Sequence, residues 1–154
     1  MSDPYQSPAP QHHQVRGGSL YSVQGVVIAS VLGSLAAGVV MLYLNYRTLG
    51  KVVLAQRWAL WGAAIYIVLI GIATLLPNTT VLALAYNVFQ AIIAYFLATQ
   101  LQGSAIAYHT SQGGSLHSNL RAAGVGFLTG LLLLFMLVFT ASLWAVYSGS
   151  AATA

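Results

Sequence analysis

Residues 24–44 read QGVVIASVLGSLAAGVVMLYL, an apolar run without a charged side chain. As one α-helix, a run of this length rises about 31 Å, close to the roughly 30 Å hydrocarbon core of a bilayer. The run is therefore predicted to cross a membrane as a continuous helix. Polar and basic residues flank it on both sides, as is usual for a membrane span.

Three further apolar segments lie at 58–76, 81–101 and 122–147. Pro77 ends the first of these, because proline cannot continue the helical hydrogen-bond ladder. The predicted fold is therefore all-α, an integral membrane bundle of four transmembrane helices within a domain covering 21–147. The two ends are predicted to be a disordered, proline-containing polar tail at 1–20 and a short uncharged tail at 148–154.

The charge content supports a membrane protein and excludes most kinds of active site. Charged residues make up 4% of the 154 residues, against roughly 25% in an ordinary soluble domain. Asp3 is the only acidic residue and there is no cysteine, so paired-carboxylate catalysis, a thiolate nucleophile and a cysteine metal site all lack their groups. We expect no enzyme activity, no cofactor and no metal. The basic residues flank apolar segments and form no patch for nucleic acid.

The basic residues also predict an orientation, because Lys and Arg are enriched in cytoplasmic loops. Four of the five lie in the two longer loops, 45–57 and 102–121, and are Arg47, Lys51, Arg57 and Arg121. The fifth, Arg16, lies in the N-terminal tail. We therefore expect both longer loops to be cytoplasmic and both termini to be non-cytoplasmic. The four loop residues are also candidates for contact with anionic lipid headgroups.

Small residues follow a regular spacing in the first and last segments. In the first they are Gly25, Ala29, Gly33 and Ala37, with Ser30, Ser34 and Gly38 in a neighbouring row; in the last they are Ala122, Gly126 and Gly130. Such rows let helix backbones approach closely in lipid. Two interpretations remain open: the rows seat the helices of one bundle, or they form an intermolecular seam or a face for a solute.

Asn87 and Gln90 are the strongly polar side chains deep in the third segment, and their spacing places them on one helix face. An amide facing lipid would leave its donors and acceptors unpaired, so both are predicted to point into the bundle, with serines of the first segment as partners. They serve either as interhelical glue or as the lining of a solute path. The four histidines, His12, His13, His109 and His117, lack metal-site spacing and are expected to be solvated, the two pairs on opposite sides of the membrane.

Short motifs surround the first segment: Tyr21-Ser22-Val23-Gln24 at its start, Leu32-Gly33-Ser34-Leu35 within it, and Asn45-Tyr46-x-x-Leu49-Gly50 at its exit. This pattern resembles a group of uncharacterised bacterial inner-membrane proteins, in which a Leu-Gly-Gly-Pro-like step occupies the middle position. The resemblance implies a bacterial cytoplasmic membrane and no particular activity. The proline of the step is absent here. Ser22 is a suitable helix N-cap, and Asn45 and Gly50 are typical of a helix exit and turn.

The sequence favours a non-catalytic, multi-pass membrane protein that acts through helix association, either with itself or as an accessory subunit of another membrane protein. The alternative is a small permease or channel for a neutral solute, oligomeric and lined by Asn87, Gln90, Ser30 and Ser34. Proton coupling through a membrane carboxylate is not expected, because the single carboxylate side chain lies in the N-terminal tail.

Overall fold

The computed structural model describes residues 18–77 and 79–151, with side chains described as far as residue 148. Four helices make up this part of the chain: α1 (Val23–Thr48), α2 (Val52–Leu75), α3 (Thr80–Ser111) and α4 (Asn119–Ala151). Each is long and apolar enough to cross a membrane, which confirms the predicted all-α membrane bundle. Within the described residues, the extended backbone pairing is limited to one isolated bridge between Leu20 and Leu116.

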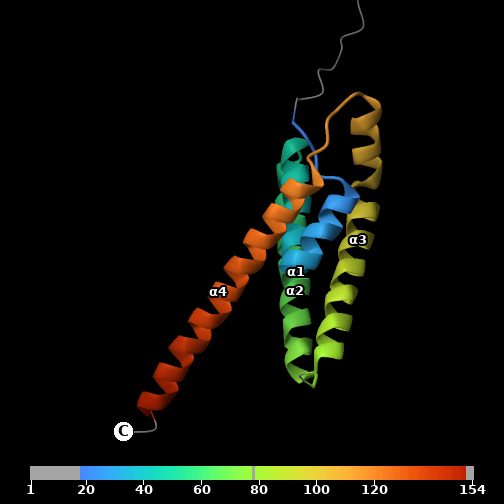
Figure 1. The fold of residues 1–154 in the computed structure, drawn as a ribbon. Helices are drawn as coiled ribbons and strands as arrows, with labels where there is room; N and C mark the ends of the chain where they lie inside the picture. Colours follow the sequence, from blue (N-terminus) through green and yellow to red (C-terminus); the bar gives the residue numbers. More distant parts are fainter. Residues whose placement is uncertain (1–17, 78, 152–154) are drawn as a thin grey trace, which may run out of the picture.

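Helix α1 is interrupted at its centre and turns back on itself. Gly33 and Ser34 have non-helical backbone angles, with φ 63° and ψ −178° at Ser34. The Tyr21 N–H, just before α1, donates to Asn45 Oδ1 at 2.7 Å, whereas a straight helix would separate these residues by about 36 Å. α1 is thus a hairpin with a first arm (23–32), a tip (Gly33 and Ser34) and a second arm (35–48) (Figure 1).

The prediction of one continuous helix over 24–44 is therefore wrong. The apolar run is long enough to span a bilayer, but its two ends lie side by side instead of on opposite faces. The break occurs without the proline of the resembling proteins. A break in a helix frees backbone N–H and C=O groups, which need polar partners in an apolar surrounding. At this tip the neighbouring helices supply the partners, as described below.

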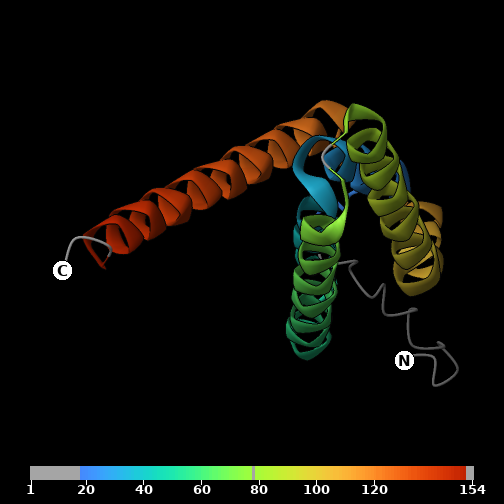
Figure 2. The same ribbon diagram turned by 90° about the horizontal axis from the view of Figure 1, so that it is seen from below.

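The hairpin lies at the centre of the bundle. Helices α2, α3 and α4 each pack mainly against α1 and diverge from it, as the view along the bundle shows (Figure 2). The buried hydrophobic core is dominated by α1, with Val26, Ala29, Leu35, Ala37, Met41 and Leu42 all buried. Residues beyond about 130 in α4 leave the bundle at an angle (Figure 1).

Helix α4 begins and ends within four residues of the sequence prediction, but two other elements differ more. Helix α2 begins at Val52, six residues before the predicted start, so Arg57 lies in the helix and not in the predicted 45–57 loop. Helix α3 continues to Ser111, although the sequence placed a polar loop from 102 onward. The extension forms because Gln102, Ile106 and His109 keep a helical spacing and are all buried. The predicted cap is confirmed at α1, where Ser22 Oγ accepts the Gly25 N–H at 3.0 Å. Gly50 forms the predicted turn with a positive φ of 74°.

Candidate functional site

A cluster of polar side chains surrounds the α1 tip. Gln90 Oε1 accepts the Leu35 N–H at 2.9 Å, and Asn87 Nδ2 donates to the Val31 carbonyl at 3.4 Å. Leu35 begins the second arm and Val31 lies near the end of the first, so α3 supplies partners for the two helix ends created by the break. Gln90 is buried.

The serines of α1 are not the partners of these amides, contrary to the prediction. Ser30 Oγ donates to the Val26 carbonyl of its own helix at 2.9 Å. Ser34 Oγ instead donates to the Tyr66 hydroxyl of α2 at 3.1 Å. The break explains the difference, because it leaves backbone groups of α1 unpaired, and these are strong donors and acceptors. The side-chain amides of Asn87 and Gln90 bond to these backbone groups and not to the serines. We call Ser34, Tyr66, Asn87 and Gln90 the tip cluster.

Helix α4 approaches the hairpin through two glycines. A Cβ atom added at Gly126 would lie 2.7 Å from the carbonyl oxygen of Ala29, and one added at Gly130 would lie 2.8 Å from that of Leu32. A Cβ atom at Gly33 would in turn overlap the Gly126 carbonyl. These distances leave no room for any side chain, so the backbones of α1 and α4 touch directly.

The other small residues divide between two contacts. Gly25 lies against Ala122, which extends the α1–α4 contact toward the start of both helices. Gly38 faces Ser30 and Ala94, so it allows the two arms and α3 to come together. The predicted rows therefore do not form one continuous face. Within this chain they seat the hairpin arms against each other and against α4.

A second polar cluster closes the base of the hairpin. Asn45 Nδ2 donates to the Tyr21 carbonyl and to Gln102 Oε1, both at 2.9 Å, and Gln102 Nε2 donates to the Leu42 carbonyl at 2.8 Å. Asn45 and Gln102 are fully buried. The burial of Gln102 was not predicted, because the sequence pattern placed this residue in a loop. The signal was present in the spacing of buried residues along α3, Gln90, Ala94, Ala98, Gln102 and Ile106.

The residues leading into α1 pack on the loop between α3 and α4, although the sequence placed 18–20 in a disordered tail. The other residues of that predicted tail, 1–17, lie outside the described residues. The Leu20 N–H donates to the Ser115 carbonyl at 3.2 Å, and the His117 N–H donates to the Leu20 carbonyl at 2.8 Å. The Tyr21 and His117 rings lie 4.5 Å apart. We call this pairing the clasp. It contradicts the predicted placement of the N-terminal segment on the side opposite the 102–121 loop; the hairpin returns the chain to the side from which it started.

Two histidines take part in this end of the bundle, and His12 and His13 lie outside the described residues. His109 is buried and not solvated as predicted, because α3 extends to Ser111, and its Nε2 lies 3.2 Å from the Ser115 carbonyl. His117 Nδ1 lies 3.3 Å from an Arg121 guanidinium nitrogen. The pKa of His117 is lowered from its ordinary value by burial and by the charge of Arg121. Among the described residues, no group of three His, Cys, Asp or Glu side chains could hold a metal ion.

The described basic residues gather at the same end as the clasp, which we call the basic end. The Arg47 guanidinium lies 5.9 Å from the centre of the Tyr43 ring, and Arg121 lies beside His117. Lys51 precedes α2. Arg57 lies farther along α2, where Leu54, Arg57, Trp58 and Trp61 line an open cavity of about 520 Å³. The only acidic side chain of the sequence, Asp3, lies outside the described residues.

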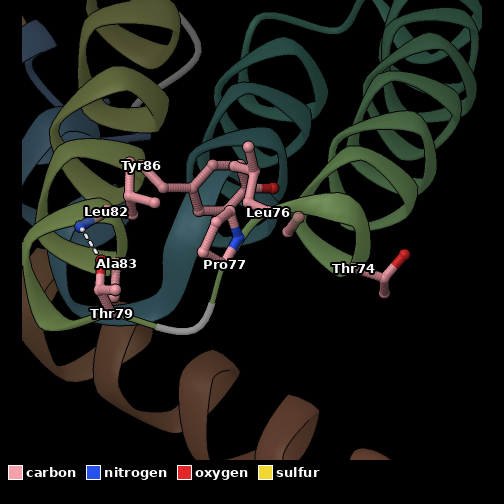
Figure 3. A pocket seen from close by; sticks show the side chains of 8 residues that line it. Thr74, Leu76, Pro77, Thr79, Leu82, Ala83 and Tyr86 are labelled. Carbon is pink, nitrogen blue, oxygen red and sulfur yellow. Dashed lines mark hydrogen bonds between the residues drawn. The ribbon is translucent and has the colours of Figure 1, made fainter.

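Another cavity, of about 340 Å³, lies at the opposite end, around the turn between α2 and α3. Tyr86, Leu76 and Pro77 form part of its wall (Figure 3). The Tyr86 hydroxyl is buried and has no hydrogen-bond partner among the described residues. The remaining wall is mostly apolar.

The polar clusters contain amides, hydroxyls and backbone groups, without a nucleophile beside a base. Their bonds join helices to one another, so the arrangement is suited to holding the hairpin in an apolar surrounding. Comparison of the chain with protein-family models, with curated proteins and with solved structures finds no match.

Proposed function

We propose that this protein is a non-catalytic, multi-pass protein of the bacterial inner membrane that acts through helix association, with itself or as a subunit of a membrane complex. The observation that carries the proposal is the distal half of α4, residues 131–148. Its large apolar side chains are exposed all around the helix; Leu137 is 65% exposed and Val146 73% exposed.

Within the described part of the chain, the distal half of α4 is little covered by the other helices, because its residues from 131 to 148 are exposed apart from Leu133. The hydroxyls of Thr140, Ser142 and Ser148 bond to carbonyls of α4 itself, as Thr140 does to Met136 at 2.9 Å. In lipid, helices associate through dispersion contacts and hydrogen bonds rather than through the hydrophobic effect. A helix that diverges from its own bundle leaves those contacts unmade, and a second helix from another molecule would supply them.

The hairpin supports a topology with three full crossings, by α2, α3 and α4. The first arm rises about 15 Å, half the thickness of the hydrocarbon core, so α1 enters and leaves on one side. The clasp and the described basic residues lie on that side, which the positive-inside rule assigns to the cytoplasm. The end of α4 then lies on the other side. This proposal replaces the expectation that both termini are non-cytoplasmic.

Cysteine crosslinking in native membranes tests the association, because the chain contains no cysteine of its own. Single cysteines placed along 131–148 should form intermolecular crosslinks that recur with the helical period. Val68→Cys on α2, where Val68 is 61% exposed, is the matched control. Crosslinking no stronger than that of the control at every α4 position, together with a monomeric mass in native mass spectrometry and no foreign subunit, would contradict the proposal.

The second candidate function is a permease or channel for a neutral solute. The observation that favours it is the broken helix, because irregular backbone at membrane depth is tolerated where it is buried in protein or lines a cavity, and transporters place binding sites at such breaks. Solute flux into vesicles containing the purified protein tests this candidate. Gln90→Leu should change the flux if the tip cluster lines the path, while flux equal to that of empty vesicles would exclude it.

A further inference from the structure

Arg57 is a cation without a counter-charge in the described part of the chain. No hydrogen bond, ion pair or ring contact joins its side chain to another described residue. The other arginines in the described ranges are placed differently, Arg47 over the Tyr43 ring and Arg121 beside His117. Arg57 also lies about 9 Å farther along the helix axis than Lys51. It is therefore the basic residue that extends farthest along α2 from the basic end.

The surroundings of Arg57 combine one charge with apolar walls. Leu54, Arg57, Trp58 and Trp61 follow one face of α2 and line the open cavity of about 520 Å³. Trp side chains concentrate at the membrane–water interface, where the apolar ring body meets the headgroup level. A guanidinium at this level presents a planar fork of N–H donors that matches a phosphate group.

We propose that this cavity binds one anionic phospholipid, with its phosphate on Arg57 and an acyl chain along Trp58 and Trp61. A free inorganic phosphate fits less well, because three of the four lining side chains are apolar and would remove its water without replacing it. A zwitterionic headgroup would bring an ammonium group to an end of the molecule that already carries Arg47 and Lys51 and offers no described carboxylate. The inference requires the chain to lie in a bilayer but does not depend on association through α4.

Tryptophan quenching by brominated lipids measures this contact directly. The chain has three tryptophans, so a Trp144→Phe background leaves only Trp58 and Trp61 as reporters. The protein is placed in phosphatidylcholine vesicles containing a minor fraction of phosphatidylglycerol brominated in its acyl chains. The reciprocal vesicles contain brominated phosphatidylcholine at the same fraction. We expect phosphatidylglycerol to bind about fivefold more strongly than phosphatidylcholine at this site.

Two charge-matched variants decide whether the preference belongs to a site. Arg57→Gln should abolish the preference for phosphatidylglycerol, while Arg47→Gln, which removes the same charge at the same end, should retain most of it. Arg57→Lys should retain only part of it, because an ammonium lacks the planar fork. Equal quenching by both lipids, or an equal loss in the Arg47 and Arg57 variants, would overturn the inference. The α4 crosslinking experiment is repeated in Arg57→Gln. Unchanged crosslinking would show that the proposed association does not depend on lipid binding at Arg57, so the lipid inference can fail without the association.

Discussion

The side-chain amide of Asn45 holds the backbone of Tyr21 from both sides, accepting its N–H at 2.7 Å and donating to its carbonyl at 2.9 Å. Tyr21 comes just before the first arm of the α1 hairpin and Asn45 lies near the end of the second arm, so the two residues meet at the base of the hairpin. One amide therefore satisfies the backbone just outside the first arm and fixes where the second arm returns. It also connects the hairpin to α3 through Gln102.

We predict that Asn45→Leu lowers the free energy of unfolding by at least about 3 kcal/mol. The substitution leaves the Tyr21 N–H, the Tyr21 carbonyl and Gln102 Oε1 without Asn45 as their partner. Each buried group left unpaired costs about 1–3 kcal/mol. Denaturant unfolding in a mild detergent measures the change. Asn119→Leu, at the exposed start of α4, is the control and should change the stability by less than about 0.5 kcal/mol. Equal effects in the two variants would refute the role of Asn45.

The tip cluster leads to a graded prediction for its two amides. Gln90→Leu should lower the stability of the bundle by about 1–3 kcal/mol, because it leaves the buried Leu35 N–H unpaired. Asn87→Leu should have a smaller effect, because its bond to Val31 is long at 3.4 Å. Thermal unfolding in detergent compares the two. Full stability in the double variant, combined with altered solute flux, would exclude the glue role and favour the permease.

Part of this fold is predictable from sequence and part is not, for identifiable reasons. The apolar runs and the glycines of α4 have local signatures, and the bundle and its small-residue rows follow from them. The hairpin has only a partial local signature, the Leu32-Gly33-Ser34-Leu35 step without its proline. Its tip also depends on Asn87 and Gln90, which lie more than fifty residues farther along the chain. Gln102 was hidden because its surroundings are polar in composition, although its spacing along α3 matches that of the buried residues.

The glycines of α4 offer a matched pair for testing the α1–α4 contact. Gly126→Ala should destabilise the bundle, because the added Cβ would lie 2.7 Å from the Ala29 backbone, whereas nothing lies within 4 Å of a Cβ at Gly124. Gly124→Ala should be neutral or stabilise the helix by up to about 1 kcal/mol, since alanine favours helix more than glycine does. Thermal unfolding of both variants gives the comparison. If Gly126→Ala is as stable as Gly124→Ala, the backbones of α1 and α4 do not touch at Gly126 as described.

The clasp should weaken in acid. The pKa of His117 is lowered from its ordinary value of 6.5 in the folded protein. As the pH falls below 6.5, the unfolded state therefore binds more protons at His117 than the folded state does. The stability that His117 contributes is therefore complete above about pH 6.5 and falls as the pH drops below it. Protonation also brings a second positive charge beside Arg121.

Hydrogen-exchange protection of the Leu20 and His117 amides, corrected for intrinsic rates, measures this dependence because both amides donate within the clasp. Protection should fall with pH in the natural protein and become independent of pH in His117→Gln. His109→Gln is the control, as His109 also contacts Ser115. If the pH dependence is lost in His109→Gln and kept in His117→Gln, the effect comes from His109 and the prediction for His117 is wrong.

The hairpin topology can be read from the accessibility of single cysteines to a membrane-impermeant maleimide in spheroplasts. Ser148→Cys, near the end of α4, should react in intact spheroplasts, and Gln112→Cys, in the loop that leads to the clasp, should react only after permeabilisation. Ser19→Cys decides between the topologies, because Ser19 pairs with Ser115 across the clasp at 2.6 Å. It should behave like Gln112→Cys. Labelling of Ser19→Cys in intact spheroplasts, together with protection of Gln112→Cys, would show that α1 crosses the membrane as a single span.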